Sequence, residues 1–221
     1  MAISYDAFSS GGGAGAGPKT FSHTCTGSNL GLFVGIMIQD TGDAVSDVTY
    51  NGVTMNSVRN GNRSYLYYLQ NPATGTNTVS VTYANSSGNG VSCVSQSYTG
   101  AGAVGATNSQ STTSGTQTLA VTTTVDNSWL VGFTGDFEDG GAFSAGTATT
   151  LRGSTNVGGS TDISGVDSNG AKTPTGSYSL QTTGNTAFQN RQIVVELTPY
   201  TAPAFTPSPM MHMMGITGGI M

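Results

Sequence analysis

The sequence places acidic side chains in two loops, each of which follows an apolar segment. Calcium prefers several hard oxygen ligands, which carboxylates and backbone carbonyls supply. The candidate ligands are Asp40, Asp43, Asp136, Glu138 and Asp139. They would form one calcium site if the two apolar segments packed symmetrically. The alternative is a pair of solvated acidic loops, and no other cofactor is expected.

The carboxylates and histidines do not form a pattern typical of a hydrolase. A glycosidase needs two carboxyl groups that face each other across a sugar. The chain has two glutamates, Glu138 and Glu196. Glu138 shares its loop with other acids, and Glu196 is expected to face outward from a closing strand. His23 lies mid-strand and is expected in the core, while His212 lies near the C-terminus, so neither a histidine metal site nor a triad is predicted. We expect no enzymatic activity.

A tyrosine-rich segment suggests either a sugar platform or core packing. Aromatic faces stack on pyranose rings, and tyrosine adds a polar tip. Tyr65, Tyr67 and Tyr68, together with Arg63, would make such a glycan-binding surface. In a strand, however, Tyr65 and Tyr67 share one face and Tyr68 takes the other, toward the core. Both interpretations remain open.

The segment 200–221 differs from the rest of the chain because it is rich in proline and methionine. Proline cannot donate to a sheet ladder, so further strand pairing is not expected. The Met-His-Met cluster could bind copper(I) through soft thioether sulfur, but methionine also makes a pliable apolar anchor, which we favour. We expect an extended assembly arm lying against a neighbouring subunit. Its anchoring residues are Phe205, Met210, Met211, His212, Met213, Met214, Ile216 and Ile220.

The composition indicates an all-β protein. Only 8% of residues are charged, against roughly 25% in average soluble proteins. Ser, Thr, Asn and Gly must therefore cover the surface, and these residues disfavour helix interiors. No segment has apolar residues at helical spacing, so almost no helix is expected. The net charge of −5 and the scattered basic residues do not indicate a nucleic-acid-binding surface.

The sequence shows no feature that directs export or membrane insertion. Its start, MAISYDAFSS, lacks the charged and apolar regions of a secretory signal. No run of 18 apolar residues occurs, so no transmembrane helix is predicted. The composition nevertheless resembles that of extracellular β proteins. A virion protein, made in the host cytoplasm and released by lysis, would reconcile these observations, and export by another route is the alternative.

Two segments of similar form organise the chain, at 21–38 and 119–133. Each is predicted to be a strand hairpin with a polar turn, and its second strand contains a Val-Gly pair. An acidic loop, an Arg-bearing strand, a Pro-Gly turn, an alternating strand and an apolar closing strand follow in both halves. Asn51-Gly52 between β-branched runs predicts a type I′ hairpin. The order of these features suggests an internal repeat.

These features predict a single antiparallel β-sandwich, jelly-roll-like, over residues 1–199. Its halves are about 2–100 and 116–199, followed by the arm at 200–221. The low-complexity stretch 101–115 is interpreted as a crossover inside one domain, with an interdomain linker as the alternative. A flexible glycine loop is expected at 9–19.

The two cysteines, Cys25 and Cys93, both fall in predicted strands. We expect two small buried thiols. A disulfide is the alternative, and it would require adjacent strands and an oxidising compartment.

Several strings along the chain resemble a known domain family: FSHT, GSN, LFVGI, VSDVTYNGVTMNSV, YLYYLQNPATGTNTVSVTY and VSCVSQSYTGA. They look like a β-sandwich domain that recurs in phage structural proteins and environmental bacterial surface proteins. The match covers nearly all of 2–198, more clearly in the first half. It departs from the family at Asn51, where Gly is usual, at Tyr67, where Trp is usual, and at Cys25 and Cys93. The resemblance implies a jelly-roll-like module on a virion or cell surface, and no catalytic residue is carried over with it.

The sequence therefore predicts a structural protein of a phage or virus particle, such as a capsid decoration, fibre or tail-associated protein. It would act by self-assembly through its loops and C-terminal arm. Its partners would be other copies of itself or other virion proteins, with no nucleic acid and no membrane. The alternative is a carbohydrate-binding or adhesion module on a virion or cell surface.

Overall fold

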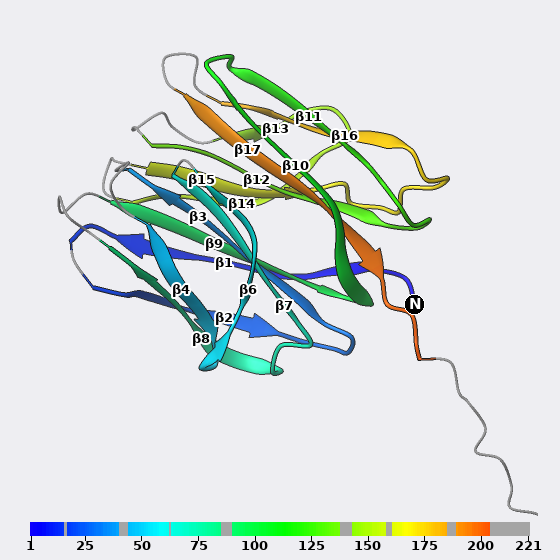
Figure 1. Cartoon of the computed structure of the whole chain (residues 1–221), viewed down its shortest axis with the longest axis horizontal. Helices are drawn as coiled ribbons and strands as arrows, with labels where there is room; N and C mark the ends of the chain where they lie inside the picture. The colour runs from blue at the N-terminus through cyan, green and yellow to red at the C-terminus, as the bar shows by residue number, and fades with distance from the viewer. Residues whose placement is uncertain are drawn as a thin grey trace, which may run out of the picture.

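The computed structural model is an all-β chain (Figure 1). It describes residues 1–15, 17–39, 44–61, 63–84, 90–137, 143–157, 161–184 and 189–203. These residues form strands and turns and contain no helix, as the composition predicts. None of them therefore forms a helix that could cross a membrane.

The first half of the chain forms two antiparallel sheets. Sheet A has the order β1-β9-β3-β7-β6, and sheet B has the order β2-β8-β4-β5. The strands of sheet A are β1 (Ser4–Gly13), β9 (Val91–Thr99), β3 (Gly31–Ile38), β7 (Ser64–Gln70) and β6 (Asn56–Gly61). The strands of sheet B are β2 (Lys19–Cys25), β8 (Gly75–Tyr83), β4 (Val45–Tyr50) and β5 (Val53–Thr54).

The second half forms two further sheets in the same way. Sheet C has the order β10-β17-β12-β15-β14, and sheet D has the order β11-β16-β13. The strands of sheet C are β10 (Ala101–Thr112), β17 (Asn190–Pro199), β12 (Trp129–Asp136), β15 (Thr161–Asp167) and β14 (Thr150–Val157). The strands of sheet D are β11 (Thr116–Thr122), β16 (Ser177–Thr183) and β13 (Ser144–Ala145). In each half, the first strand pairs with the last and the second with the last but one.

The four sheets stack in the order B, A, C, D, and three apolar cores separate them (Figure 1). The first core lies between sheets A and B, the second between A and C, and the third between C and D. We call the second core the seam. Sheets A and C are thus covered on both faces, which explains why β3 and β12 are buried at every position. The structure confirms the all-β, antiparallel sandwich class, and its described strands form four stacked sheets.

The two segments predicted to be hairpins instead cross between sheets. β2 pairs with β8 in sheet B, while β3 pairs with β7 and β9 in sheet A. The connecting turn uses positive φ at Gly27 and Asn29. β11 and β12 are separated in the same way, between sheets D and C. The hairpin at Asn51-Gly52 is confirmed, with φ of 50° and 74° at its two central residues.

The Val-Gly pairs of the two halves lie on opposite faces of their sheets. Val34 packs in the core between A and B, whereas Val131 packs in the seam. Successive strand residues point to opposite faces, so a shift of one position reverses the facing. The sheets of the two halves therefore share a strand order, but the matching Val-Gly residues do not occupy equivalent faces of their sheets.

Two stretches predicted to be irregular are strands. Residues 101–112 of the low-complexity stretch 101–115 form β10, an edge strand of sheet C. The glycine-rich stretch continues β1 as far as Gly13. Phe21 packs directly against Gly11, and a Cβ at position 11 would lie 2.6 Å from the Phe21 ring. Glycines in these stretches thus allow close packing.

Candidate functional site

The seam joins the two halves through aromatic side chains that fit against glycines. The Phe33 ring lies 4.6 Å from that of Tyr68 and 6.4 Å from that of Phe133. A Cβ on Gly35 would lie 2.7 Å from Phe133 Cγ. The absent side chain at this position lets sheet C approach sheet A, so the seam is packed like a protein interior.

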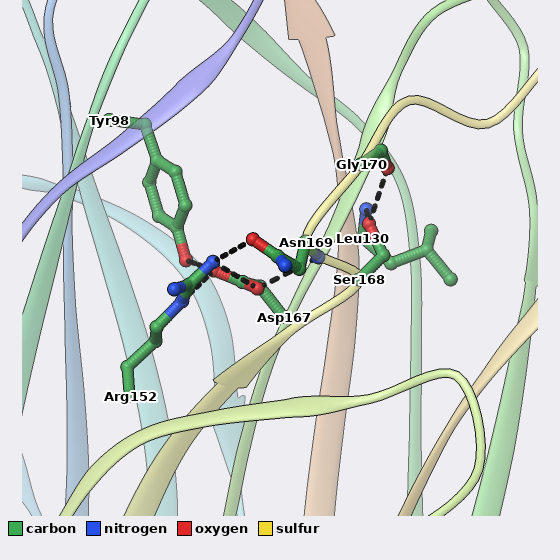
Figure 2. A network of polar contacts seen from close by, with 7 residues as sticks. All are labelled: Tyr98, Leu130, Arg152, Asp167, Ser168, Asn169 and Gly170. Carbon is green, nitrogen blue, oxygen red and sulfur yellow. Dashed lines mark hydrogen bonds and ion pairs between the residues drawn. The ribbon is translucent and has the colours of Figure 1, made fainter.

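A buried ionic network crosses the seam beside these rings (Figure 2). Asp167 is fully buried at the end of β15. Arg152 donates to both of its carboxylate oxygens, from Nε at 2.7 Å and Nη2 at 2.9 Å. Tyr98 Oη on sheet A donates to the same carboxylate at 2.9 Å, and so does the Asn169 backbone N–H at 2.9 Å. Each oxygen accepts two bonds, so the buried charge is both paired and hydrogen-bonded.

The electrostatics of this network favour a fixed structural contact. Burial, and then the negative charge of Asp167, raise the pKa of Tyr98 well above its ordinary value. Tyr98 therefore remains a hydrogen-bond donor at physiological pH. The Arg152 guanidinium also stacks 4.0 Å from the ring centroid of Tyr5 on β1. Arg152 and Asp167 of sheet C thus hold two tyrosines of sheet A.

A short loop after β15 completes the network (Figure 2). Ser168 Oγ accepts a bond from the Leu130 N–H at 3.1 Å and donates to the Gly170 carbonyl at 2.9 Å. Asn169 has a φ of 44° and accepts a bond from Arg152 Nη2 at 2.8 Å. The loop is therefore attached both to the central strand of sheet C and to the seam.

Glu196 is buried, which corrects the expectation that it faces outward. Its carboxylate accepts bonds from the N–H groups of Ala106, Thr124 and Val125 and from the hydroxyls of Thr124 and Ser128. Burial by itself would raise its pKa, but these donors lower the pKa below the ordinary value. Glu196 fixes the crossing between β11 and β12 and has no reactive geometry.

His23 is a core residue, as predicted, although its partners resemble a catalytic set. Its Nε2 lies 3.0 Å from Ser97 Oγ and its Nδ1 lies 2.8 Å from Ser95 Oγ. Ser97 Oγ donates to Asp6 at 2.7 Å. The aspartate therefore contacts the serine, whereas a triad places it on the histidine. Burial lowers the pKa of His23 to about 4, although Asp6 opposes this, so the ring is neutral at pH 7.

Cys25 and Cys93 are buried and carry free thiols, which confirms the expectation of two buried thiols. Both belong to the core between sheets A and B. Burial raises the pKa of Cys25, and it raises the pKa of Cys93 to about 12. Because the thiolate is the reactive form, both are poor nucleophiles.

The three tyrosines predicted to bind glycan are core residues. Tyr65, Tyr67 and Tyr68 are only 8%, 6% and 5% exposed. Tyr65 and Tyr67 pack between sheets A and B, and Tyr68 lies in the seam, where its hydroxyl donates to the Gly102 carbonyl. A stacking platform needs exposed ring faces, so these residues do not form one. Sequence alternation correctly predicted their opposite facing.

The remaining predicted site residues lie in different surroundings. Arg63 stacks 3.9 Å from the ring centroid of Phe137. Asp136 is buried at the end of β12 and is not in an exposed loop. Four of the calcium candidates lie outside the described residues: Asp40, Asp43, Glu138 and Asp139. Within the described ranges, no three His, Cys, Asp or Glu side chains gather as a metal site.

The predicted assembly residues also lie outside the described part of the chain. These are Phe205, Met210, Met211, His212, Met213, Met214, Ile216 and Ile220. The described chain ends at Pro203, immediately beyond Ala202, which lines a surface cavity.

Figure 1 shows that the N-terminus lies beside the end of β17. The cavity is lined by residues from both segments, and we call it the end cavity. It has a volume of about 750 Å³, and its lining includes Ile3, Trp129, Pro199 and Tyr200. The Met1 amino group donates to the Tyr200 carbonyl at 3.2 Å. Sequence reasoning missed the end cavity, because nothing local in the sequence places residue 1 beside residue 200.

Comparison of the chain with protein-family models, curated proteins and solved structures finds no match. The resemblance to phage and bacterial surface β-sandwich domains therefore stays a prediction.

Proposed function

We propose that the protein is a structural component of a phage or virus particle, built from two jelly-roll-like units of one strand order. The observation that carries this proposal is that the first residues and the end of β17 meet at one end of a four-layer body. A segment that continues from Pro203 starts at that end. The opposite end of the body is then free to project from the surface to which the protein attaches.

The packing of the two units supports a role as a rigid block. The seam contains interlocked rings and a buried ionic network, and a charged pair buried with all its hydrogen bonds resists separation. Both halves therefore move as one body. A decoration or fibre module needs this property, because it transmits its orientation from the point of attachment.

The arm supplies the attachment in this proposal. Residues 204–221 contain methionine, isoleucine and phenylalanine and no Asp, Glu, Lys or Arg. Burial of apolar surface contributes about 25 cal/mol per Å², so a few hundred Å² would give several kcal/mol before ordering costs. Partners would be other copies of the chain or other virion proteins.

The test compares the full chain with a truncation that lacks 207–221. Sedimentation velocity over a concentration series should show species larger than the 22.3 kDa monomer for the full chain, and only a monomer, lighter by its missing 15 residues, for the truncation. A full-length variant with Met210, Met211, Met213 and Met214 replaced by Ser separates apolar anchoring from length. Equal assembly of the truncation and the full chain, or a full chain that stays monomeric and does not enter particles, would refute the proposal.

A carbohydrate-binding or adhesion module is the second candidate, and the end cavity favours it. The half-buried Tyr200 lines the end cavity beside the polar side chain of Asn127, and sugar sites combine aromatic faces with a few polar groups. A glycan array with the full chain tests this candidate. Saturable binding that Tyr200→Ala abolishes would support it, while absence of binding together with arm-dependent assembly would favour the structural role.

A further inference from the structure

The end cavity has a mainly apolar lining. Ile3 and Trp129 line it and are only 5% and 7% exposed, and Pro199 and Ala202 line it beside them. Among the described residues of the lining, none is Asp, Glu, Lys or Arg, and the exposed Met1 amino group donates to a backbone carbonyl. Such a lining favours an apolar occupant, because a charged group would lose its water on entry.

The end cavity is large enough for several apolar side chains. Its volume is about 750 Å³, and an apolar protein cavity of about 150 Å³ holds one benzene molecule. About five groups of that size would therefore fill the end cavity. A chain segment with several neighbouring apolar side chains fits this volume.

The arm at the end of the same chain has this composition. Residues 204–221 include one phenylalanine, five methionines and two isoleucines, and four of the methionines fall within 210–214. Methionine adapts to irregular apolar surfaces because its side chain is unbranched and flexible. The segment also contains no Asp, Glu, Lys or Arg. The arm and the end cavity therefore match in polarity.

The arm starts beside the end cavity and is long enough to reach a neighbouring molecule. Ala202 lines the end cavity, and the described chain ends one residue later. The prolines at 203, 207 and 209 favour extended backbone in the residues before them, which disfavours a reversal into the cavity that the chain has just left. Eighteen extended residues span about 60 Å, whereas a folded body of about 200 residues has a radius of gyration of roughly 17 Å.

We propose that the arm of one copy enters the end cavity of a second copy, and that the second copy returns its own arm in the same way. The arm and the end cavity lie at the same end of the body, so one two-fold axis satisfies both contacts, and such an isologous contact closes on itself. Two copies therefore form a closed dimer joined end to end and not an open filament. This inference rests on the proposed assembly role and names its partner.

Two full-length variants with the same change in net charge test the end cavity. Ala171→Arg puts a charge at an exposed lining position, and Ala120→Arg puts the same charge at an exposed position of β11. In sedimentation velocity, wild type and Ala120→Arg should reach twice the 22.3 kDa of the chain. Ala171→Arg should associate at least about a hundredfold more weakly, because the arm would bury its charge. Thr201→Arg, at a second exposed lining position, repeats the test if Ala171→Arg does not fold.

A mixing experiment tests exchange between copies. Ala171→Arg keeps the arm and loses the receiving cavity, whereas the full-length variant with four arm methionines replaced by Ser keeps the cavity and loses the apolar arm. Each should be monomeric alone, and their mixture should contain a species heavier than either monomer. With the serine variant ¹⁵N-labelled, the amide signals of Ala171 and Thr201 should shift when unlabelled Ala171→Arg is added, and not when unlabelled serine variant is added.

Three results would overturn the proposal and leave arm-dependent assembly standing. Equal dimerisation of Ala171→Arg and Ala120→Arg would show that the arm binds elsewhere on the second copy. A monomeric wild type whose Ala171 and Thr201 signals differ from those of the serine variant would show that the arm fills its own cavity. A monomeric wild type that enters particles only with its arm would assign the arm to another virion protein. A full chain that neither dimerises nor enters particles would instead refute the assembly role itself.

Discussion

Replacing Glu196 with Gln should strongly destabilise the second half of the molecule. The substitution preserves the shape of the side chain but puts an amide nitrogen where a carboxylate oxygen stood. At Oε1 that nitrogen would face the N–H groups of Thr124 and Val125, and at Oε2 it would face the N–H of Ala106. Either orientation therefore leaves at least one backbone donor without its acceptor.

The expected loss is about 3 kcal/mol in the free energy of unfolding. A buried donor that loses its acceptor costs about 1–3 kcal/mol, and the remaining bonds lose their charge assistance at about 1 kcal/mol each. The neutral amide is easier to bury, which offsets part of this loss. Asp126→Asn is a matched control, because Asp126 is exposed and accepts a bond from the Thr175 N–H. It should cost under about 1 kcal/mol.

Urea unfolding followed by the fluorescence of Trp129, the single tryptophan, measures both values. The pKa of Glu196 is lower in the folded chain, so its contribution is present above the unfolded pKa of about 4.3 and is lost as pH falls through the folded pKa. The difference in the free energy of unfolding between wild type and Glu196→Gln should therefore become smaller as the pH falls. A loss of less than about 1 kcal/mol at pH 7, or a gap that does not depend on pH, would refute this account of Glu196.

Three further predictions concern the packed interior. Gly35→Ala should cost about 1–3 kcal/mol by overpacking, because its Cβ would lie 2.7 Å from Cγ of Phe133 and closer still to the ring edge. A Cβ at Gly170 would meet nothing closer than 3.9 Å, so Gly170→Ala is the control. Equal melting temperatures for the two variants would contradict this. The pKa of His23 is about 4, below the ordinary value of about 6.5, so stability should fall by up to about 3 kcal/mol as pH drops through that window. The free energy of unfolding of His23→Gln, measured with urea, should lack this part of the pH dependence. A dependence on pH equal to that of wild type would contradict the prediction. Cys25 and Cys93 should react with a thiol reagent only after unfolding, and rapid labelling of the native protein would show that the core is open.

Much of the local structure could be predicted from the sequence because strand residues alternate between two faces. The alternation in 64–70 correctly placed Tyr65 and Tyr67 on one face of the strand and Tyr68 on the other. Asn51-Gly52 predicted its hairpin, because both residues accept positive φ. The fully apolar β3 also indicated burial on both faces. These features depend only on neighbours along the chain.

The candidate sites were harder to predict because their residues meet only across sheets. Glu196 resembles an ordinary polar residue within a strand, and its donors come from two other segments of the chain. Ile3 and Tyr200 belong to different halves and line one cavity only because sheet A stacks on sheet C. No local pattern encodes these distances.

The sequence by itself determined the all-β class and the alternation of side chains between the two faces of each strand. The low content of charged residues and the absence of helical periodicity were sufficient to predict the all-β class, because both can be read from each segment without knowing its tertiary contacts. Only the tertiary structure decided that the segment 21–38 crosses between sheets and that the described strands stack in four layers. Sheet pairing and stacking are long-range contacts, and several arrangements would bury the same apolar residues equally well. Glycines such as Gly35 and the ionic network at Asp167 fit the arrangement observed.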